Sequence, residues 1–245
     1  PVATGYTGAT GIATAGIAGT TLTLTGTTAA DTITGSATLI NVIIGGGDAD
    51  IIVGGGVADT ITGGAGADTI NGGVGNDFIV YTTATDGGAE ATVADVTAAT
   101  ADFLASTADS VTFVSADDTI RIDGALEALL EAAGATDISS NTANLDYNAV
   151  GIFMIAAAQG ELAADNFGDV SAVAAAFNTG NGTAANPAAN DEIIFTLENS
   201  ANTATGLYYF QDVDGDGDFS NNDQITLLGV INAAGLAAAA GDPSN

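Results

Sequence analysis

A nine-residue period near the start of the chain constrains its fold more than any other sequence feature. An acidic or amide side chain recurs along residues 31–77, and an isoleucine follows each of these positions by two residues. The polar residues are Asp31, Asn41, Asp50, Asp59, Asp68 and Asp77, and the isoleucines are Ile33, Ile43, Ile52, Ile61, Ile70 and Ile79. The first interval is 10 residues and each later one is 9. A fixed short period of this kind is the signature of a solenoid, in which each repeat stacks on its neighbours.

Each residue type in the repeat has a separate physical role. Glycine adopts backbone conformations that other residues avoid, so it lets the carbonyl groups of a turn point at an ion. Aspartate supplies the hard anionic oxygen that calcium prefers as a ligand. Isoleucine packs well on a pleated wall and suits the narrow interior of a coil. The period therefore predicts strands joined by acidic, glycine-rich turns.

The repeat unit G-G-x-G-x-D-x-U-x, where U is apolar, resembles the calcium-binding nonapeptide of the RTX family. Two units match it completely, Gly63–Asn71 and Gly72–Val80. Two further units, Gly45–Val53 and Gly54–Thr62, carry Asp48 and Val57 in place of the third glycine. The units that start at Gly26 and Gly35 retain little beyond the polar residue and the isoleucine.

The resemblance implies a parallel β-roll in which nine residues form half a coil and an ion bridges one turn to the turn two units further along. This geometry pairs Asp50 with Asp68 and Asp59 with Asp77, with a weaker pair between Asn41 and Asp59, and we expect two or three Ca²⁺ ions. The candidate metal residues are Asp50, Asp59, Asp68, Asp77, Gly63, Gly64, Gly66, Gly72, Gly73 and Gly75. The alternative is a metal-free solenoid whose aspartates are solvated turn residues, but stacked carboxylates would then repel one another without compensation.

The charge of the chain also points to a cation. There are 30 acidic side chains against one basic one, and the formal net charge is −29. Self-repulsion opposes folding unless another source of positive charge is present. Nucleic acid is excluded as a partner because phosphate binding needs lysine and arginine, and an anionic membrane surface would repel the chain. No apolar run is long enough to predict a membrane span.

Catalytic residue types are scarce, so we expect no enzyme. The chain has no histidine and no cysteine, which removes a histidine base, a zinc-protease motif and a cysteine nucleophile. A carboxylate pair suited to glycoside hydrolysis remains an option in principle, but no tryptophan is present to bind a sugar ring. The single basic residue, Arg121, is expected to pair with a neighbouring carboxylate.

A second acidic loop, "DVDGDGDFSNND", fits the calcium-loop template D-x-[DN]-x-[DN]-G-x5-[DE]. The template assigns side-chain oxygens to Asp212, Asp214 and Asp216, a backbone carbonyl to Asp218 and a final carboxylate to Asp223. The flanking runs "GLYYFQ" and "QITLLGV" favour strands, whereas an EF-hand needs two helices. The loop therefore predicts a calcium-stapled β-hairpin, and the alternative is an acidic surface turn without metal.

The predicted fold is mainly β: a calcium-binding parallel β-roll followed by a β-rich domain with a few short helices. Residues 1–30 form a Thr/Gly-rich strand segment, 31–80 the roll, 81–110 a connection and 111–245 the β-rich domain. Within the last domain, "SVTFV" and "DTIRID" predict two strands around a turn, and residues 124–134 and 169–177 predict helices. Further strands are expected at "GIFMIAAAQ", "EIIFTL" and "TGLYYFQ".

These observations favour a calcium-dependent extracellular structural protein that self-assembles as a subunit of a bacterial S-layer or surface filament. Its expected partner is itself, and a cell-surface polysaccharide is a further candidate. The alternative is the calcium-binding module of a secreted adhesin or of another type I secreted RTX protein. The RTX resemblance implies export through a C-terminal signal, which agrees with the lack of an N-terminal signal peptide.

Overall fold

The computed structural model describes two compact units. One comprises Pro1–Gly88 with Ala108–Leu126, and the other Ala89–Thr107 with Glu127–Asn245. Within them the described residues are 2–4, 20–87, 91–92, 108–113, 118–126, 137–140, 151–154, 162, 167–181, 191–201, 203–213 and 223–232. The fold is mainly β with parallel strands, as the repeat predicts.

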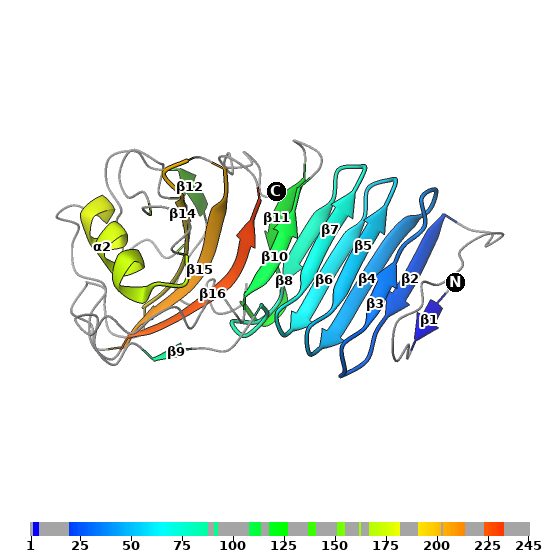
Figure 1. Cartoon of the computed structure of the whole chain (residues 1–245), viewed down its shortest axis with the longest axis horizontal. Helices are drawn as coiled ribbons and strands as arrows, with labels where there is room; N and C mark the ends of the chain where they lie inside the picture. Colours follow the sequence, from blue (N-terminus) through cyan, green and yellow to red (C-terminus); the bar gives the residue numbers. More distant parts are fainter. Residues whose placement is uncertain are drawn as a thin grey trace. The chain divides into compact units, whose positions relative to one another are not determined.

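The first unit is a roll of two parallel sheets (Figure 1). One sheet has the order β1-β2-β4-β6-β8-β11, and the other contains the order β3-β5-β7-β10. Consecutive strands from β2 to β8 therefore alternate between the sheets, and each repeat contributes one strand and one turn. The strands are β1 (Val2–Thr4), β2 (Thr21–Thr25), β3 (Thr32–Thr34), β4 (Ile40–Gly47), β5 (Ile51–Gly55), β6 (Thr60–Ala65), β7 (Thr69–Gly73), β8 (Phe78–Tyr81), β10 (Asp109–Thr112) and β11 (Thr119–Ile122).

The isoleucine of each repeat forms the core of the roll. Side chains alternate between the two faces of a strand, so the isoleucine of each repeat points inward while its neighbours along the strand point outward or toward the turn. The parallel register places Ile43 beside Ile61 in one sheet and Ile52 beside Ile70 in the other. The repeat isoleucines Ile33, Ile43, Ile52, Ile61, Ile70 and Ile79 are all buried. The period of the sequence is thus the period of the stacked core.

The roll continues beyond the last complete repeat. Strand β10 pairs in parallel with β7, and β11 pairs in parallel with β8. The two strands "SVTFV" and "DTIRID" therefore lie in different sheets and do not form the hairpin that the sequence suggests. Residues 108–126 belong to the roll unit, whereas the sequence interpretation divided them between a connection and the β-rich domain.

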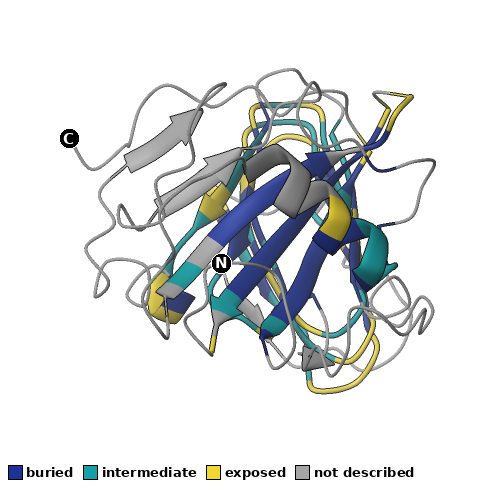
Figure 2. Cartoon of the chain, turned by 90° about the vertical axis from the view of Figure 1, so that its left-hand side faces the viewer, coloured by how far each residue is buried: buried dark blue, intermediate teal, exposed yellow. Residues whose placement is uncertain are grey.

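The second unit contains a mixed sheet with the order β12-β13-β14-β15-β16. Its first three strands pair in parallel and its last three pair antiparallel. Phe195 stacks on Tyr208 with ring centroids 4.9 Å apart, and Figure 2 shows buried residues along these strands in dark blue. The elements are β9 (Ala91–Thr92, paired with β16), β12 (Asp137–Ser140), β13 (Gly151–Met154), α2 (Val170–Asn181), β14 (Asp191–Glu198), β15 (Thr205–Asp212) and β16 (Gln224–Ile231).

Helix α2 confirms the helix expected at residues 169–177 and extends further, to Asn181. Asp169 caps its N-terminus, because its Oδ1 accepts hydrogen bonds from the backbone N–H groups of Ser171 and Ala172. These bonds and one from the Ser171 hydroxyl lower the pKa of Asp169, led by the hydroxyl bond. Residues 124–126 are helical, and the rest of the helix expected at 124–134 lies outside the described residues.

Candidate metal centre

The repeat aspartates are buried, not solvated. Each lies one residue before a roll strand, at the end of a turn, and its exposed fraction is at most 1%. These residues are Asp50, Asp59, Asp68 and Asp77. A surface turn that used aspartate only for solubility would leave the carboxylate in water. The turns instead hold four carboxylates inside the edges of the roll.

One oxygen of each aspartate belongs to a hydrogen-bond ladder. On the first edge, the N–H of Asp31 donates to Asp50 Oδ1 at 2.7 Å, and the N–H of Asp50 donates to Asp68 Oδ1 at 2.8 Å. The opposite edge repeats the pattern from Asn41 to Asp59 at 2.7 Å and from Asp59 to Asp77 at 2.8 Å. The structure thus brings together the three pairs that the RTX resemblance implies.

The other carboxylate oxygen has no hydrogen-bond partner. Oδ2 of Asp50, Asp59, Asp68 and Asp77 is buried and unsatisfied. Burial without a donor disfavours the ionised form. It raises the pKa of Asp50, Asp59 and Asp68 to about 6 and also raises that of Asp77. Four such orphaned oxygens in one small unit are stabilised by a proton or by a positive partner.

A backbone carbonyl oxygen lies near two of the orphaned oxygens, those of Asp50 and Asp59, beside the first glycine of each turn. A Cβ added to Gly45 would lie 2.4 Å from Asp50 Oδ2 and 2.5 Å from the Gly63 carbonyl oxygen. On the other edge, a Cβ on Gly54 would lie 2.8 Å from Asp59 Oδ2 and 2.2 Å from the Gly72 carbonyl oxygen. Two acceptors therefore face one another with no hydrogen between them. Carboxylate and carbonyl oxygens are the ligands of Ca²⁺.

The remaining repeat glycines let successive turns stack closely. Gly64, Gly66, Gly73 and Gly75 have φ angles of +102°, +137°, +97° and +147°, which other residues rarely adopt. A Cβ on Gly64 would lie 2.2 Å from the Gly46 carbonyl oxygen of the neighbouring coil. The first glycines Gly63 and Gly72 are equally close-packed, since a Cβ there would lie 2.2 and 2.4 Å from the Oδ2 atoms of Asp68 and Asp77. Glycine at these positions gives the turns their geometry.

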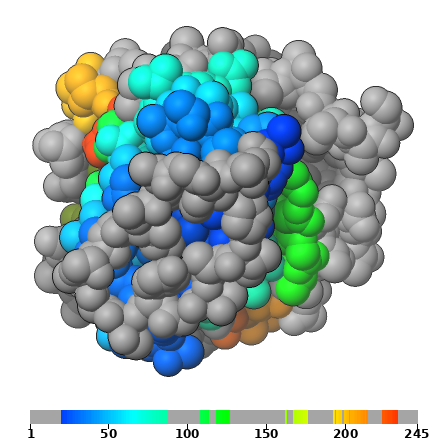
Figure 3. Space-filling model, turned by 90° about the vertical axis from the view of Figure 1, so that its right-hand side faces the viewer, coloured from blue at the N-terminus to red at the C-terminus, as the bar shows by residue number. Residues whose placement is uncertain are grey.

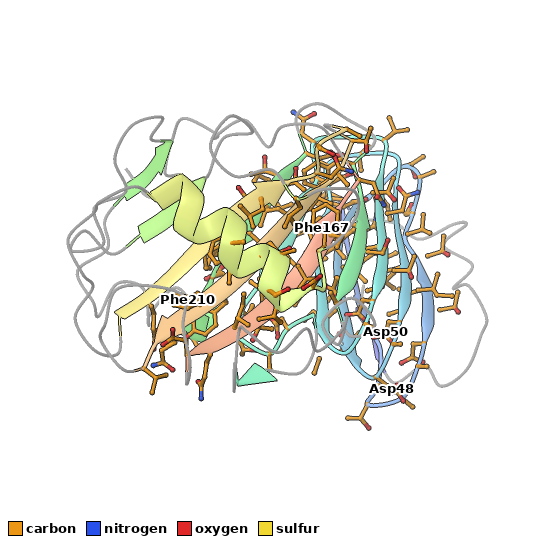
Figure 4. All side chains as sticks on the ribbon, turned by 60° about the vertical axis from the view of Figure 1, so that its left-hand side comes forward. Asp48, Asp50, Phe167 and Phe210 are labelled. Carbon is orange, nitrogen blue, oxygen red and sulfur yellow. The ribbon has the colours of Figure 1, made fainter. Side chains whose placement is uncertain are left out.

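The imperfect repeat at residues 45–53 keeps this turn geometry. Asp48, at the third-glycine position, has a φ of +67° and lies exposed, in the left-handed region that aspartate tolerates. Figure 4 labels Asp48 at the outer tip of the turn and Asp50 within the edge of the roll. Val57, at the same position of the next repeat, has no positive φ. Loss of the third glycine therefore does not remove the aspartate from its ladder.

Four aspartates outside the predicted set join the same edges. Asp109 Oδ1 accepts the N–H of Asp68 at 2.9 Å, and Asp118 Oδ1 accepts that of Asp77 at 3.0 Å. Burial and the charge of Asp68 raise the pKa of Asp109 to about 8. Asp109 and Asp118 are nine residues apart and each precedes an apolar residue by two, so the period was visible in the sequence. The other two are Asp31, which lies 10 residues before Asn41, and Asp86, which lies 9 residues after Asp77.

The metal sites of the roll must combine carboxylates with backbone oxygens. Within the described ranges, no group of three or more acidic side chains is close enough to hold an ion by itself. Two aspartates from stacked turns and the carbonyl groups of their glycines provide the available donors. Bound calcium would neutralise the orphaned oxygens and connect turns two units apart.

The second acidic loop is described only at its two ends. Asp212 ends β15, and Asp223 lies just before β16 and is buried. Asp223 Oδ1 accepts the backbone N–H of Val213 at 3.0 Å, which ties the two ends of the loop together. Strands β15 and β16 are antiparallel neighbours, as the flanking sequences predict. Asp214, Asp216 and Asp218 lie outside the described residues.

The fold and these turns define a parallel β-roll whose edges are built for a hard cation. Comparison with known families agrees: residues 44–79 match the model of the RTX calcium-binding nonapeptide repeat, with four copies. This segment therefore carries RTX calcium-binding repeats, which are typical of secreted proteins. No curated protein matches the chain. In the described part of the chain, no helix has the length and apolar character needed to cross a membrane.

Proposed function

We propose that the protein is a calcium-dependent extracellular structural protein, a self-assembling subunit of a bacterial S-layer or surface filament. The observation that carries this proposal is the row of buried, unsatisfied aspartate oxygens on both edges of the roll. Metal binding to such a site supplies folding free energy. Calcium sites of extracellular modules have Kd values on the order of 10⁻⁴–10⁻³ M, so the roll folds where calcium is abundant.

A structural role fits the residue types of the chain better than catalysis does. The whole sequence lacks histidine, cysteine and lysine, and its single arginine pairs with Asp123 at the surface. The buried aspartates are engaged in the hydrogen-bond ladder. We therefore propose no enzymatic activity and no organic cofactor. Export by type I secretion and attachment to a cell-surface polysaccharide belong to the same proposal.

Self-assembly is supported by apolar residues on the outer face of the roll. Ile40 and Ile44 on β4 are 46% and 41% exposed, and Ile51 on β5 is 52% exposed. The register places Ile44 between Thr25 and Thr62 on the neighbouring strands. Figure 3 looks onto the N-terminal side of the roll, where its residues reach the surface in blue and cyan. Ile40 and Ile44 lie on one sheet and Ile51 on the other, so both sheets expose apolar side chains that are available to contact another protein surface.

A second candidate is the calcium-binding module of a secreted adhesin or of another type I secreted RTX protein. The observation in its favour is that the repeats are confined to one compact unit. The other unit has a mixed sheet and its own aromatic core. In this case the roll stabilises or spaces a binding domain, and the purified protein remains monomeric.

Electron microscopy and light scattering distinguish these two functions. We expect purified protein to form ordered sheets or fibres in millimolar calcium, and these should dissolve when calcium is chelated. The double substitution Ile40→Thr and Ile44→Thr should prevent assembly while calcium still induces the strand signal in circular dichroism. Val74→Thr, at an exposed turn residue, serves as the control. A monodisperse monomer in millimolar calcium would reject assembly and favour the adhesin module.

A further inference from the structure

The side-chain amide of Asn41 has hydrogen-bond partners at both of its polar atoms, unlike the carboxylates of the aspartates that follow it. Its Nδ2 lies 3.0 Å from the Ser36 carbonyl oxygen, 2.9 Å from that of Leu39 and 3.2 Å from that of Gly54. It also lies 2.9 Å from Asp59 Oδ1. Its Oδ1 accepts the N–H of Ser36 at 2.8 Å, which defines the orientation of the amide. One nitrogen is therefore surrounded by four oxygens from two stacked turns.

Elsewhere in the roll, a glycine carbonyl oxygen and an aspartate Oδ2 lie close together, and the Oδ2 has no hydrogen-bond partner. Beside Gly45, the Gly63 carbonyl oxygen and Asp50 Oδ2 converge and no hydrogen lies between them. Beside Gly35, the corresponding atoms are the Gly54 carbonyl oxygen and Asn41 Nδ2, and here the nitrogen donates to the oxygen. An amide NH₂ group has two hydrogens and no charge. It therefore satisfies a carbonyl oxygen that a carboxylate would leave facing a second acceptor.

We propose that Asn41 is a built-in substitute for a calcium ion. It joins the turn at residues 35–41 to the turn at 54–59 by hydrogen bonds, where later turns of the roll are joined by metal. This position therefore takes no ion, and calcium is confined to the turns that follow. The inference rests on the proposed calcium binding and replaces the weak Asn41–Asp59 metal pair that the resemblance implies.

Two turns whose aspartates, Asp31 and Asp86, accept bonds from protein donors support this division. Asp31 Oδ2 accepts bonds from the Thr27 N–H at 2.7 Å and the Thr27 hydroxyl at 2.9 Å, although its Oδ1 is unpartnered. Asp86 Oδ2 accepts bonds from the Thr82 N–H at 2.6 Å and the Thr82 hydroxyl at 2.8 Å. Threonine replaces the second repeat glycine in both turns. Its donors engage Oδ2 of Asp31 and Asp86, whereas Oδ2 of Asp50, Asp59, Asp68 and Asp77 has no donor.

The substitution Asn41→Asp tests the proposal on the full-length protein. It restores the repeat aspartate and places a carboxylate against Asp59 Oδ1 and the Gly54 carbonyl oxygen. We expect the variant to bind one more Ca²⁺ per chain than the natural protein in equilibrium dialysis at neutral pH. In calcium-free buffer its melting temperature should fall below that of the natural protein. Asn76→Asp makes the same charge change at an exposed turn residue, and its calcium stoichiometry should be unchanged.

The converse substitution, Asp50→Asn, tests the same proposal if the Asn41→Asp variant does not fold. Asp50 donates its N–H to Asp68 as Asn41 donates to Asp59, so Asn at position 50 places an amide at an interior turn. We expect one ion fewer and a smaller loss of strand signal on calcium removal. If a folded Asn41→Asp, or Asp50→Asn, binds as many ions as the natural protein, the inference is wrong while calcium dependence stands. A natural protein that binds no Ca²⁺ would overturn both the inference and the proposed function.

Discussion

Each repeat aspartate uses its two oxygens for different purposes. Oδ1 accepts a backbone N–H from the stacked turn, as Asp68 does from Asp50 at 2.8 Å. Oδ2 stays without a donor, against the first glycine of its own turn. The hydrogen bond positions the carboxylate precisely enough that the free oxygen faces a carbonyl group. The residue is therefore structural through one oxygen, and the other oxygen is the one available to a metal ion.

The glycines make a residue-scale prediction with a matched control. Gly66 has a φ of +137°, and an added Cβ would lie 2.3 Å from the Asp48 carbonyl oxygen. Gly66→Ala should therefore lower the free energy of unfolding in calcium by about 2–4 kcal/mol, through backbone strain and overpacking. Gly47→Ala should be nearly neutral, because its Cβ would meet nothing closer than 3.6 Å. Denaturant titrations of both variants measure the difference, and equal stabilities would contradict the stacked-turn geometry.

The pKa values of the buried aspartates predict an inverted pH dependence for the metal-free roll. Burial raises the pKa of Asp50, Asp59 and Asp68 from 3.8 to about 6. Between these values the folded state binds more protons than the unfolded chain, so its free energy of unfolding falls as the pH rises. Calcium competes with these protons, so calcium affinity should rise over the same range.

This pH dependence can be measured with protein stripped of metal. Denaturant midpoints at a series of pH values from 4 to 8 should decrease with pH in the absence of calcium and increase in its presence. Asp59→Asn removes one titrating carboxylate and should make the metal-free decrease shallower. A metal-free stability that rises between pH 4 and 7 would contradict the burial of these carboxylates.

At the scale of the element, each roll strand presents alternate residues to two environments. Strand β5 contains two adjacent isoleucines, of which Ile51 is 52% exposed and Ile52 is fully buried. Both residues pair with the same neighbouring strand, β7: Ile51 lies opposite Thr69 and Ile52 opposite Ile70. The same residue type therefore contributes to the core at one position and to the outer face at the next.

This pair gives an element-scale prediction. Ile52→Ala removes buried methyl groups and leaves a cavity in the stacked core, which should lower the free energy of unfolding by about 2–5 kcal/mol. Ile51→Ala changes only the outer face and should stay within about 0.5 kcal/mol of the natural protein. Denaturant unfolding in millimolar calcium compares them. A large loss for Ile51→Ala and a small one for Ile52→Ala would show that the strand has the opposite register.

For the molecule as a whole, the net charge of −29 and the division into two compact units both bear on how stability depends on calcium. The roll concentrates buried carboxylates along its edges, so its stability depends on positive charge from outside the chain. The mixed sheet of the other unit is stabilised by apolar packing around Phe195, Tyr208 and Leu227. Calcium should therefore control the two units to different extents.

Hydrogen exchange measured with and without calcium tests this difference. On chelation, β2–β8 should lose protection together with β10 and β11, because these strands share one core and one pair of ladders. The strands β14–β16 should keep most of their protection. Loss of protection in all strands at the same calcium concentration would show instead that the two units unfold cooperatively.

Much of the roll was predictable because its information is local. The aspartate, the isoleucine two residues later and the glycines before them recur within nine residues, so one repeat contains its turn, its core contact and its candidate metal ligand. The strand runs before and after the second acidic loop were predictable for the same reason, since alternation and turn residues are local signals. The burial of Asp50, which decides its role, is already implied by the stacking of identical units.

Other features depend on contacts between residues far apart in the chain. Asp109 lies 41 residues beyond Asp68, yet it accepts the N–H of that residue. The period resumes at Asp109 and Asp118 after an interruption, but the parallel pairing of β10 with β7 follows from packing that no local pattern encodes. The substitution of an amide for a cation at Asn41 is likewise visible only when two turns are stacked. The sequence by itself determined the repeat, the turn chemistry and the kind of metal, because these are properties of nine consecutive residues. The tertiary structure decided which oxygens lie together at the edges of the roll, because these oxygens come from two coils.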